Sequence, residues 1–411
     1  MSYHYHKLSN GLRIIHKPAK STVSHAGLMV ETGSRDEKPE ENGMAHLIEH
    51  LIFKGTKKRK TWHILSRIEN VGGELNAYTT KEETTVYASF LSSYYERTLE
   101  LFSDVAFRSV FPEKEMEKEK EVIIDEINSY NDSPSELIFD DFEDLLFDGH
   151  SLGRNILGTI ENIKNFSRKE VLRFAKQHYS IDNMVLASVG EIPFDKLIKL
   201  AEKHFGDITP VKNILHRKPF KKFIPSDKII KKNTYLSHLM IGTTAYSRLD
   251  AKKPALMLLN NLLGGPALNS RLNMSIREKY GFAYQIESYY QPYSDSGVFS
   301  VYLGTDKKYT SKGKELILKE LDKLKRNRIG TLQLQRAKNQ FIGQMAISYQ
   351  QPLNEMLGMA KSHLYRDTIK TFEENVQIIR NITSSKLMEV ANEIFPEKRL
   401  SSIVYENKNI N

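Results

Sequence analysis

Two histidines and a glutamate lie close together in the segment His46-Leu47-Ile48-Glu49-His50. The flanking residues are apolar and free of proline, which predicts a buried helix. On a helix, residues four apart lie one turn above each other, so His46 and His50 are side by side. Their neutral imidazole nitrogens can bind one tetrahedral zinc ion. Glu49 lies on the same side, where it is placed to act as a base without binding the metal.

The alternative interpretation is that these three residues share a core helix by coincidence. Two imidazoles and a carboxylate are costly to bury in apolar surroundings when they have no partner. A metal site removes that cost, and the order H-x-x-E-H occurs in zinc hydrolases. We therefore favour the metal site.

A hydrolytic zinc site needs a third protein ligand and an open position for water. The chain has no cysteine, which leaves histidines and carboxylates as ligands. The best candidates lie in a predicted helix at Pro112–Tyr130. Glu126 is beside the apolar face of this helix, and Glu119 precedes it by two helical turns, so both point the same way. One of the two is expected to bind the metal while the other supports it.

Length and composition fit a globular protein of several domains. The chain has 411 residues, of which 40% are hydrophobic and 27% charged. About two to three domains are expected at this length. No apolar run is long enough to cross a membrane, and the N-terminus lacks the features of a signal peptide. The simplest expectation is a cytoplasmic protein without a membrane partner.

The net charge of +9 raises the possibility of nucleic-acid binding. The basic clusters are scattered along the chain and are not interleaved with aromatic residues as in a nucleic-acid-binding module. A solvated surface explains them better, so no nucleic-acid partner is expected. Nucleic-acid binding remains the less favoured alternative.

Periodicity in the first half predicts both strands and helices around the His46 segment. The predicted strands are Tyr5–Leu8, Leu12–His16, Val23–Val30, Glu74–Thr80, Thr84–Leu91 and Met184–Val189. Further helices are predicted at Thr61–Val71, Tyr94–Arg108, Ser135–Phe147, Ser167–Tyr179 and Pro193–His204.

The second half repeats part of this order. The helix and strand that begin at Ser167 and Met184 match a helix and strand that begin at Thr383 and Leu400, at one constant offset. At the same offset, the His46 segment falls on Leu262–Pro266, which contains no zinc ligand. We predict a zinc-binding domain at 1–210, a polar linker at 211–232, and a related metal-free domain at 233–411.

These motifs resemble the inverzincin or pitrilysin family (peptidase family M16), in the branch similar to the processing-peptidase subunits. His46–His50 followed by Phe53-Lys54-Gly55-Thr56 matches the inverted zinc motif of that family. The resemblance implies that Glu126 is the third ligand and Glu119 its accessory glutamate. It also implies an α+β fold of two similar halves, each a mainly antiparallel sheet covered by helices.

Two other stretches are similar to substrate-binding parts of the family. Gly72–Thr79 resembles an edge strand that pairs with extended substrate, which implies substrate contacts at Asn76 and Ala77. Arg277 and Tyr284 resemble a pair that grips peptide carbonyls.

The function implied by the resemblance is a zinc endopeptidase or oligopeptidase with Glu49 as its base. It would form a homodimer whose closed chamber admits short or unfolded peptides. The alternative is a non-catalytic scaffold or partner subunit with the same fold. Such relatives usually lose ligands or the base, and this chain has all of them.

Overall fold

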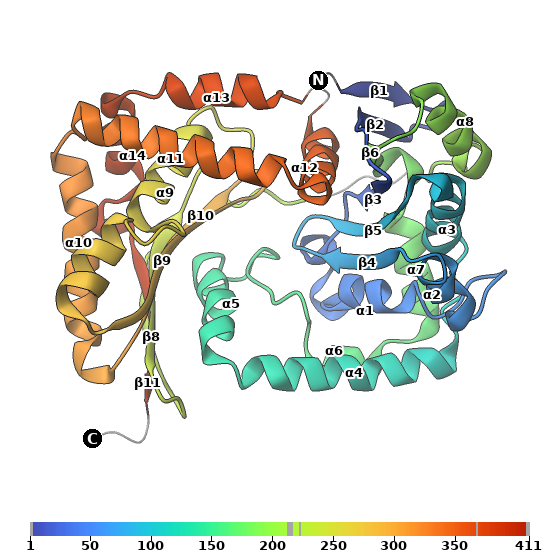
Figure 1. The fold of residues 1–411 in the computed structure, drawn as a ribbon. Helices are drawn as coiled ribbons and strands as arrows, with labels where there is room; N and C mark the ends of the chain where they lie inside the picture. Colours follow the sequence, from blue (N-terminus) through green and yellow to red (C-terminus); the bar gives the residue numbers. More distant parts are fainter. Residues whose placement is uncertain (1–2, 212–216, 222, 367–368, 408–411) are drawn as a thin grey trace. The chain divides into compact units, whose positions relative to one another are not determined.

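Two β-sheets, each with its own helices, organise the chain in the computed structural model, which describes residues 3–211, 217–221, 223–366 and 369–407 (Figure 1). The first compact unit comprises Met1–Ile127, Arg154–Arg217 and Ile347–Thr371. The second comprises Asn128–Gly153, Lys218–Ala346 and Phe372–Asn411. The predicted α+β fold of two sheets covered by helices is confirmed.

The first sheet has the strand order β1-β2-β6-β3-β5-β4. Neighbouring strands are antiparallel except for the pair β2 and β6. The strands are β1 (His4–Lys7), β2 (Arg13–Pro18), β3 (Val23–Val30), β4 (Glu74–Thr79), β5 (Thr84–Leu91) and β6 (Met184–Gly190). β4 therefore lies at an edge of the sheet, and among the described strands it pairs with β5 alone.

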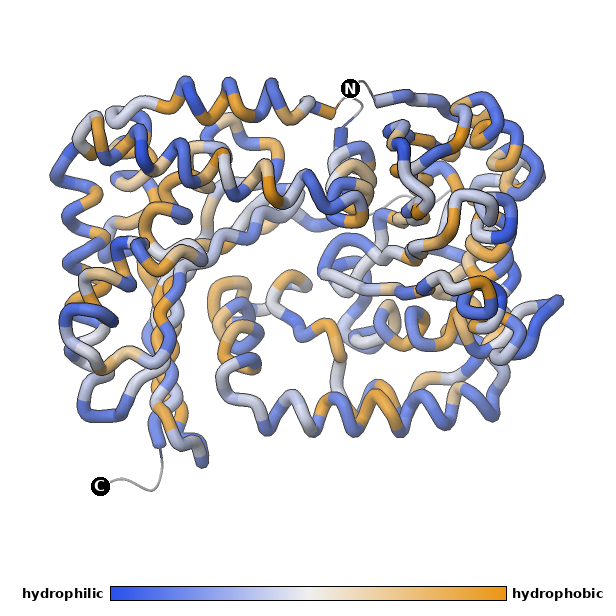
Figure 2. Tube along the Cα trace, in the orientation of Figure 1, coloured by the Kyte–Doolittle hydropathy of each residue, from blue (hydrophilic) through white to orange (hydrophobic). Residues whose placement is uncertain are grey.

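Helices cover both faces of the first sheet. One face packs in a large apolar core with α1 (Met44–Leu51), α2 (Thr61–Glu69), α3 (Tyr95–Phe107), α4 (Glu113–Asn131), α6 (Ile160–Asn165), α7 (Arg168–His178) and α8 (Phe194–Phe205). The other face packs against α12 (Pro352–Tyr365) through Met356 and Met359. Figure 2 shows that α4 is mainly hydrophilic with a hydrophobic middle, where Ile123 and Ile127 are buried.

The second sheet has the order β7-β11-β8-β10-β9. Its strands are β7 (Asp227–Lys232), β8 (Ser237–Thr244), β9 (Ala283–Pro292), β10 (Gly297–Thr305) and β11 (Ser401–Asn407). The helices of this unit are α5 (Pro134–Leu146), α9 (Lys253–Gly264), α10 (Thr310–Arg326), α11 (Thr331–Tyr349), α13 (Phe372–Arg380) and α14 (Ser384–Ile394). Among the described residues, no helix has the length and apolar character needed to span a bilayer.

The two sheets repeat the same plan. From β2 onward, the order β2-β6-β3-β5-β4 corresponds to β7-β11-β8-β10-β9, and each sheet contains one parallel pair at the same place, β2 with β6 and β7 with β11. The helices α7 and α14 also begin alike, because the Ser167 and Thr383 hydroxyls accept hydrogen bonds from the backbone of the first turn. The predicted similarity of the two halves is thus confirmed.

The predicted linker at 211–232 is wrong at its carboxyl end, because Asp227–Lys232 forms strand β7. This strand lies at the sheet edge and its side chains are mostly exposed, so no alternation of polar and apolar residues marks it. Residues 212–216 and 222 of the predicted linker lie outside the described residues.

The units also depart from a simple division of the chain at the linker. Residues 128–153, which include α5, belong to the second unit, and 347–371, which include α12, belong to the first. α5 packs on β8 and β11, with Ile138 and Phe142 buried, while α12 packs on β3 and β6. The apolar face of each of these helices covers the sheet face that the other helices of its unit leave open.

A buried histidine should make the stability of the metal-free protein depend on pH. His16 on β2 is 0% exposed, and burial together with the nearby His4 lowers its pKa to about 4. The unfolded chain therefore binds a proton more readily than the folded chain does. Below the ordinary histidine pKa, the free energy of unfolding should fall as pH falls, by up to about 3 kcal/mol near pH 4.

Denaturant unfolding of chelator-treated protein from pH 7 to pH 4.5 checks this expectation. His16→Gln should show a smaller loss of stability over that range. Part of the dependence of stability on pH should remain, because His46 is also buried. His63, which is exposed on α2, provides the control, and His63→Gln should keep the wild-type slope. Equal slopes for His16→Gln and wild type would show that His16 does not resist protonation.

Candidate metal centre

Helix α1 presents two imidazoles side by side. Its apolar residues Leu47, Ile48 and Leu51 are buried in the core of the first unit, which fixes the rotation of the helix. His46 and His50 therefore share another face, with ring centroids 4.7 Å apart and ring planes at 70°. This is the juxtaposition expected from their four-residue spacing.

Helix α4 supplies two carboxylates to the same place. Glu119 and Glu126 are two turns apart, and each approaches the histidines of α1. The Glu126 Oε2 atom lies 3.8 Å from His46 Nε2 and 3.7 Å from His50 Nε2. Neither distance is a hydrogen bond, so the three groups converge without binding one another.

The three converging groups fit a zinc ion. One donor atom from each of His46, His50 and Glu126 lies within 4.8 Å of the other two. Ligand atoms in a tetrahedral zinc site are roughly 3.3 Å apart, given metal–ligand distances of about 2.0–2.1 Å. The two distances from Glu126 Oε2 to the histidine nitrogens, 3.8 and 3.7 Å, exceed that value by only a few tenths of an ångström. Two imidazoles and a carboxylate are also a known ligand set for catalytic zinc.

Protonation favours the same assignment. Burial, with a smaller effect from His50, lowers the pKa of His46 to about 4. His46 is therefore neutral at pH 7, with a lone pair available to a cation. The His50 Nδ1 atom lies 3.1 Å from Glu119 Oε2. A carboxylate can only accept hydrogen bonds, so the Nδ1 atom of His50 carries the proton. The Nε2 atom of His50, which faces Glu126, is then free to bind metal.

Lys54 adds a support that our sequence analysis missed. Its Nζ atom lies 2.7 Å from Glu119 Oε1, so Glu119 is held between Lys54 and His50. Lys54 lies three residues beyond the end of α1, so no helical spacing marks it. Its pair with buried Glu119 depends on a contact between α4 and the segment after α1 that the local sequence does not specify.

Glu49 lies on the same helix as the histidines and close to Thr79 at the end of β4. Burial raises the pKa of Glu49, while Thr79 and the charge of His50 oppose that rise. A raised pKa makes its carboxylate a stronger base than an exposed glutamate. Thr79 was predicted as part of the strand, but its contact with Glu49 was not predicted.

Comparisons with known proteins agree with this geometry. The family described as insulinase (peptidase family M16) matches residues 13–160, and the peptidase M16 inactive domain matches residues 165–341. The uncharacterized zinc protease YmxG of Bacillus subtilis is 32% identical over 404 residues, which cover 98% of each chain. The chain belongs to peptidase family M16.

Other M16 relatives extend the comparison. The beta subunit of the bovine mitochondrial-processing peptidase is 32% identical over 305 residues, which cover 72% of this chain and 62% of that protein. In fold, the M16 chain is similar to a protease from Helicobacter pylori, with a TM-score of 0.92 and 23% identity over 98% of this chain and 99% of that one. A peptidase M16 inactive domain from Pseudomonas fluorescens gives a TM-score of 0.93 at 17% identity, over 99% of this chain and 98% of that one.

The predicted substrate-binding residues of this M16 protein lie in both units. Asn76 and Ala77 are on β4, whose outer side has no neighbouring strand in the part of the chain that the structure describes. In the second unit, Arg277 lies in the π-helical segment η5 (Asn273–Glu278) and Tyr284 on β9. Both side chains are exposed, Tyr284 by 57%. Their roles remain predictions.

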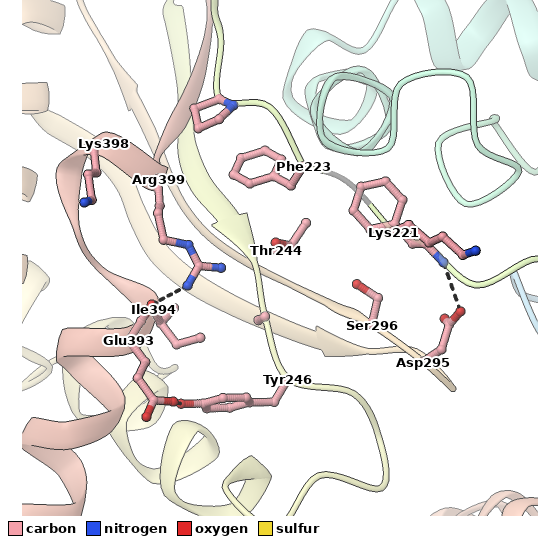
Figure 3. Close-up of a pocket in the computed structure, with 13 residues that line it drawn as sticks. Lys221, Phe223, Thr244, Tyr246, Asp295, Ser296, Glu393, Ile394, Lys398 and Arg399 are labelled. Atoms are coloured by element: carbon pink, nitrogen blue, oxygen red, sulfur yellow. Dashed lines mark hydrogen bonds between the residues drawn. The ribbon is translucent and has the colours of Figure 1, made fainter.

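A cavity of about 640 Å³ lies in the second unit, apart from the residues of the candidate site (Figure 3). Thr244, Tyr246, Ser296 and Arg399 are among its lining residues. Arg399 donates a hydrogen bond to the Glu393 carbonyl at 2.6 Å. None of the predicted zinc or substrate residues lines this cavity.

Proposed function

We propose that this M16 protein is a zinc-dependent endopeptidase or oligopeptidase that hydrolyses short or unfolded peptides. The observation that supports this most strongly is the convergence of His46, His50 and Glu126 beside Glu49. The first three residues would hold the zinc ion. The fourth is close to them, is partly buried, and has a raised pKa.

Zinc held by these residues would polarise the scissile carbonyl and make a water molecule easier to deprotonate. Glu49 takes a proton from the attacking water at its carboxylate and later donates it to the leaving amine. Glu119 accepts a hydrogen bond from His50 Nδ1–H and so keeps that imidazole in the tautomer whose Nε2 can bind metal. Lys54 balances the charge of Glu119.

The edge strand β4 suggests how a peptide would be recognised. An edge strand offers unpaired N–H and C=O groups to an extended chain, and such pairing is independent of side-chain sequence. Asn76 and Ala77 would pair with the peptide, and Thr79 would bring that strand close to Glu49. Arg277 and Tyr284 would donate hydrogen bonds to peptide carbonyls. Extended substrates are favoured, because a folded protein does not present a free strand.

A peptide-library assay of the purified protein tests the proposed function. Cleavage should occur, should stop after treatment with a zinc chelator, and should return when zinc is restored. The same protein should show no salt-sensitive binding to a DNA duplex. Zinc binding without cleavage of any peptide would instead favour a non-catalytic scaffold or partner subunit.

Because Glu119 supports a metal ligand, we expect its substitution to cause a moderate loss of zinc affinity. Glu119→Gln should weaken zinc binding by roughly 10–100-fold, as is typical for a partner behind a metal ligand, because the amide no longer holds His50 as a carboxylate does. Competition with a zinc-binding dye measures the change. Glu121→Gln, an exposed position on the same helix, is the control and should match wild type. Loss of all zinc from Glu119→Gln would show that Glu119 is itself a ligand.

We further propose a homodimer in which each site combines zinc residues of one chain with Arg277 and Tyr284 of the other. Glu49→Gln and Tyr284→Phe homodimers should both be poor enzymes. After subunit exchange, a mixed dimer has one site with both changes and one with neither, so activity should return. Activity that stays absent in dimers proven to be mixed would contradict composite sites.

A further inference from the structure

Helix α1 has no cap of its own at its amino end. Its N-cap residue is Gly43, which has φ +99° and no side chain, and the first turn contains no acidic residue. The first amides of a helix have no partner within the helix and need acceptors when they are buried. These amides immediately precede His46, so a group that binds them also affects the position of the His46 imidazole.

The acceptor comes from Glu37, a residue outside the helix. Its side chain is buried, with the residue 4% exposed. Oε1 accepts a hydrogen bond from Ala45 N at 2.8 Å, and Oε2 accepts one from Gly43 N at 3.0 Å. Oε2 also accepts from Asn42 Nδ2 at 3.1 Å. One carboxyl group therefore binds both the N-cap amide and an amide within the first turn.

The surroundings hold Glu37 in place. The Arg154 Nη2 atom donates to the Glu37 carbonyl at 2.5 Å. Burial raises the pKa of Glu37, while the bonds from Ala45, Asn42 and Gly43 and the charge of Arg154 oppose that rise. A buried carboxyl that faces three N–H donors cannot be replaced by another group without leaving donors unpaired.

Gly43 has little room to move away from this anchor. A Cβ atom there would lie 2.8 Å from the Leu157 carbonyl oxygen and 2.9 Å from Ile163 Cδ1. The start of α1 is thus pressed against residues 157–163 on one side and bonded to Glu37 on the other. A shift of the helix would move His46, Glu49 and His50 together, because all three project from its next turns.

We propose that Glu37 is a positioning residue of the metal centre: it anchors the amino end of α1 and so sets where both histidines and Glu49 lie. This inference rests on the proposed zinc site. The reason it affects chemistry is geometric, since metal ligands and a catalytic base must be held to within about 0.5 Å of their working positions.

Cobalt binding to metal-free protein tests the positioning role without any need for peptidase activity. In Glu37→Gln, one oxygen becomes an NH₂ group, which would face Ala45 N–H or the Gly43 and Asn42 donors. We expect cobalt to bind at least about tenfold more weakly, by analogy with other groups that support metal ligands. We also expect the visible spectrum of the bound cobalt to change, and kcat to fall more than KM rises.

Glu41→Gln is the matched control. Glu41 is also a buried acid just before α1, but it binds Arg173 Nη2 at 2.9 Å and Lys38 N at 3.3 Å. The substitution Glu41→Gln should therefore lower the stability of the protein without changing its cobalt affinity or the spectrum of the bound cobalt. All samples are compared at a temperature at which thermal unfolding shows them to be folded.

Unchanged cobalt affinity and spectrum in folded Glu37→Gln would overturn the proposal, even if that variant melts earlier. If Glu37→Gln does not fold, the same measurements on Glu37→Asp decide, since aspartate keeps the carboxyl group and is one methylene shorter; wild-type cobalt binding there would overturn the proposal. Wild-type protein that binds no metal would refute the zinc site itself, which is a separate result.

Discussion

Glu49→Gln should retain zinc and lose nearly all peptide hydrolysis. Glutamine keeps the size of the side chain and removes the proton acceptor, and general bases typically contribute about 10²–10⁴-fold to the rate. The loss of rate should lie at the upper end of this range, because the same carboxyl group serves both proton transfers. Zinc binding should survive, since the groups that converge on the metal position are His46, His50 and Glu126.

Zinc stoichiometry and hydrolysis measured on the same preparation check the role of Glu49. Glu69→Gln is a suitable control, because Glu69 is exposed at the end of α2 and should keep both zinc and activity. Wild-type turnover in Glu49→Gln would remove this residue from the mechanism. Loss of zinc would instead identify Glu49 as a ligand.

Glu126→Gln should lose zinc affinity more severely than Glu119→Gln. Glu126 Oε2 lies within 3.8 Å of both His46 Nε2 and His50 Nε2, whereas Glu119 contacts Nδ1, the other nitrogen of His50. A carboxylate ligand replaced by an amide loses its charge, so the loss should exceed the roughly 10–100-fold typical of a supporting residue.

The order of the two effects is the informative result for Glu126. Competition with a zinc-binding dye measures both variants together with Glu121→Gln, which should equal wild type. If Glu119→Gln empties the site and Glu126→Gln keeps its zinc, the assignments of ligand and supporting residue are reversed.

Local spacing made much of the candidate site predictable. The side-by-side placement of His46 and His50 follows from their position four residues apart on one helix, and the common direction of Glu119 and Glu126 follows from two turns of another. These relations need no knowledge of tertiary structure. The similarity of the two halves was also visible, because matched helices and strands recur at a constant offset.

Contacts between distant segments were not predictable in the same way. The bond of Lys54 to Glu119, and that of Glu37 to the amides of α1, depend on how loops and helices pack. Strand β7 has the sequence character of a linker because an exposed edge strand shows no alternation of polar and apolar residues. The packing of α5 and α12 on sheets from the other half of the sequence has no local signature at all.

Zinc titration into metal-free protein, with hydrolysis of a cleaved peptide followed in the same samples, tests the central claim most directly. The account predicts that hydrolysis rises in proportion to bound zinc, levels off at one zinc per chain, and is absent in His50→Asn. Full activity in metal-free wild-type protein, or equal zinc binding and activity in His50→Asn, would contradict it.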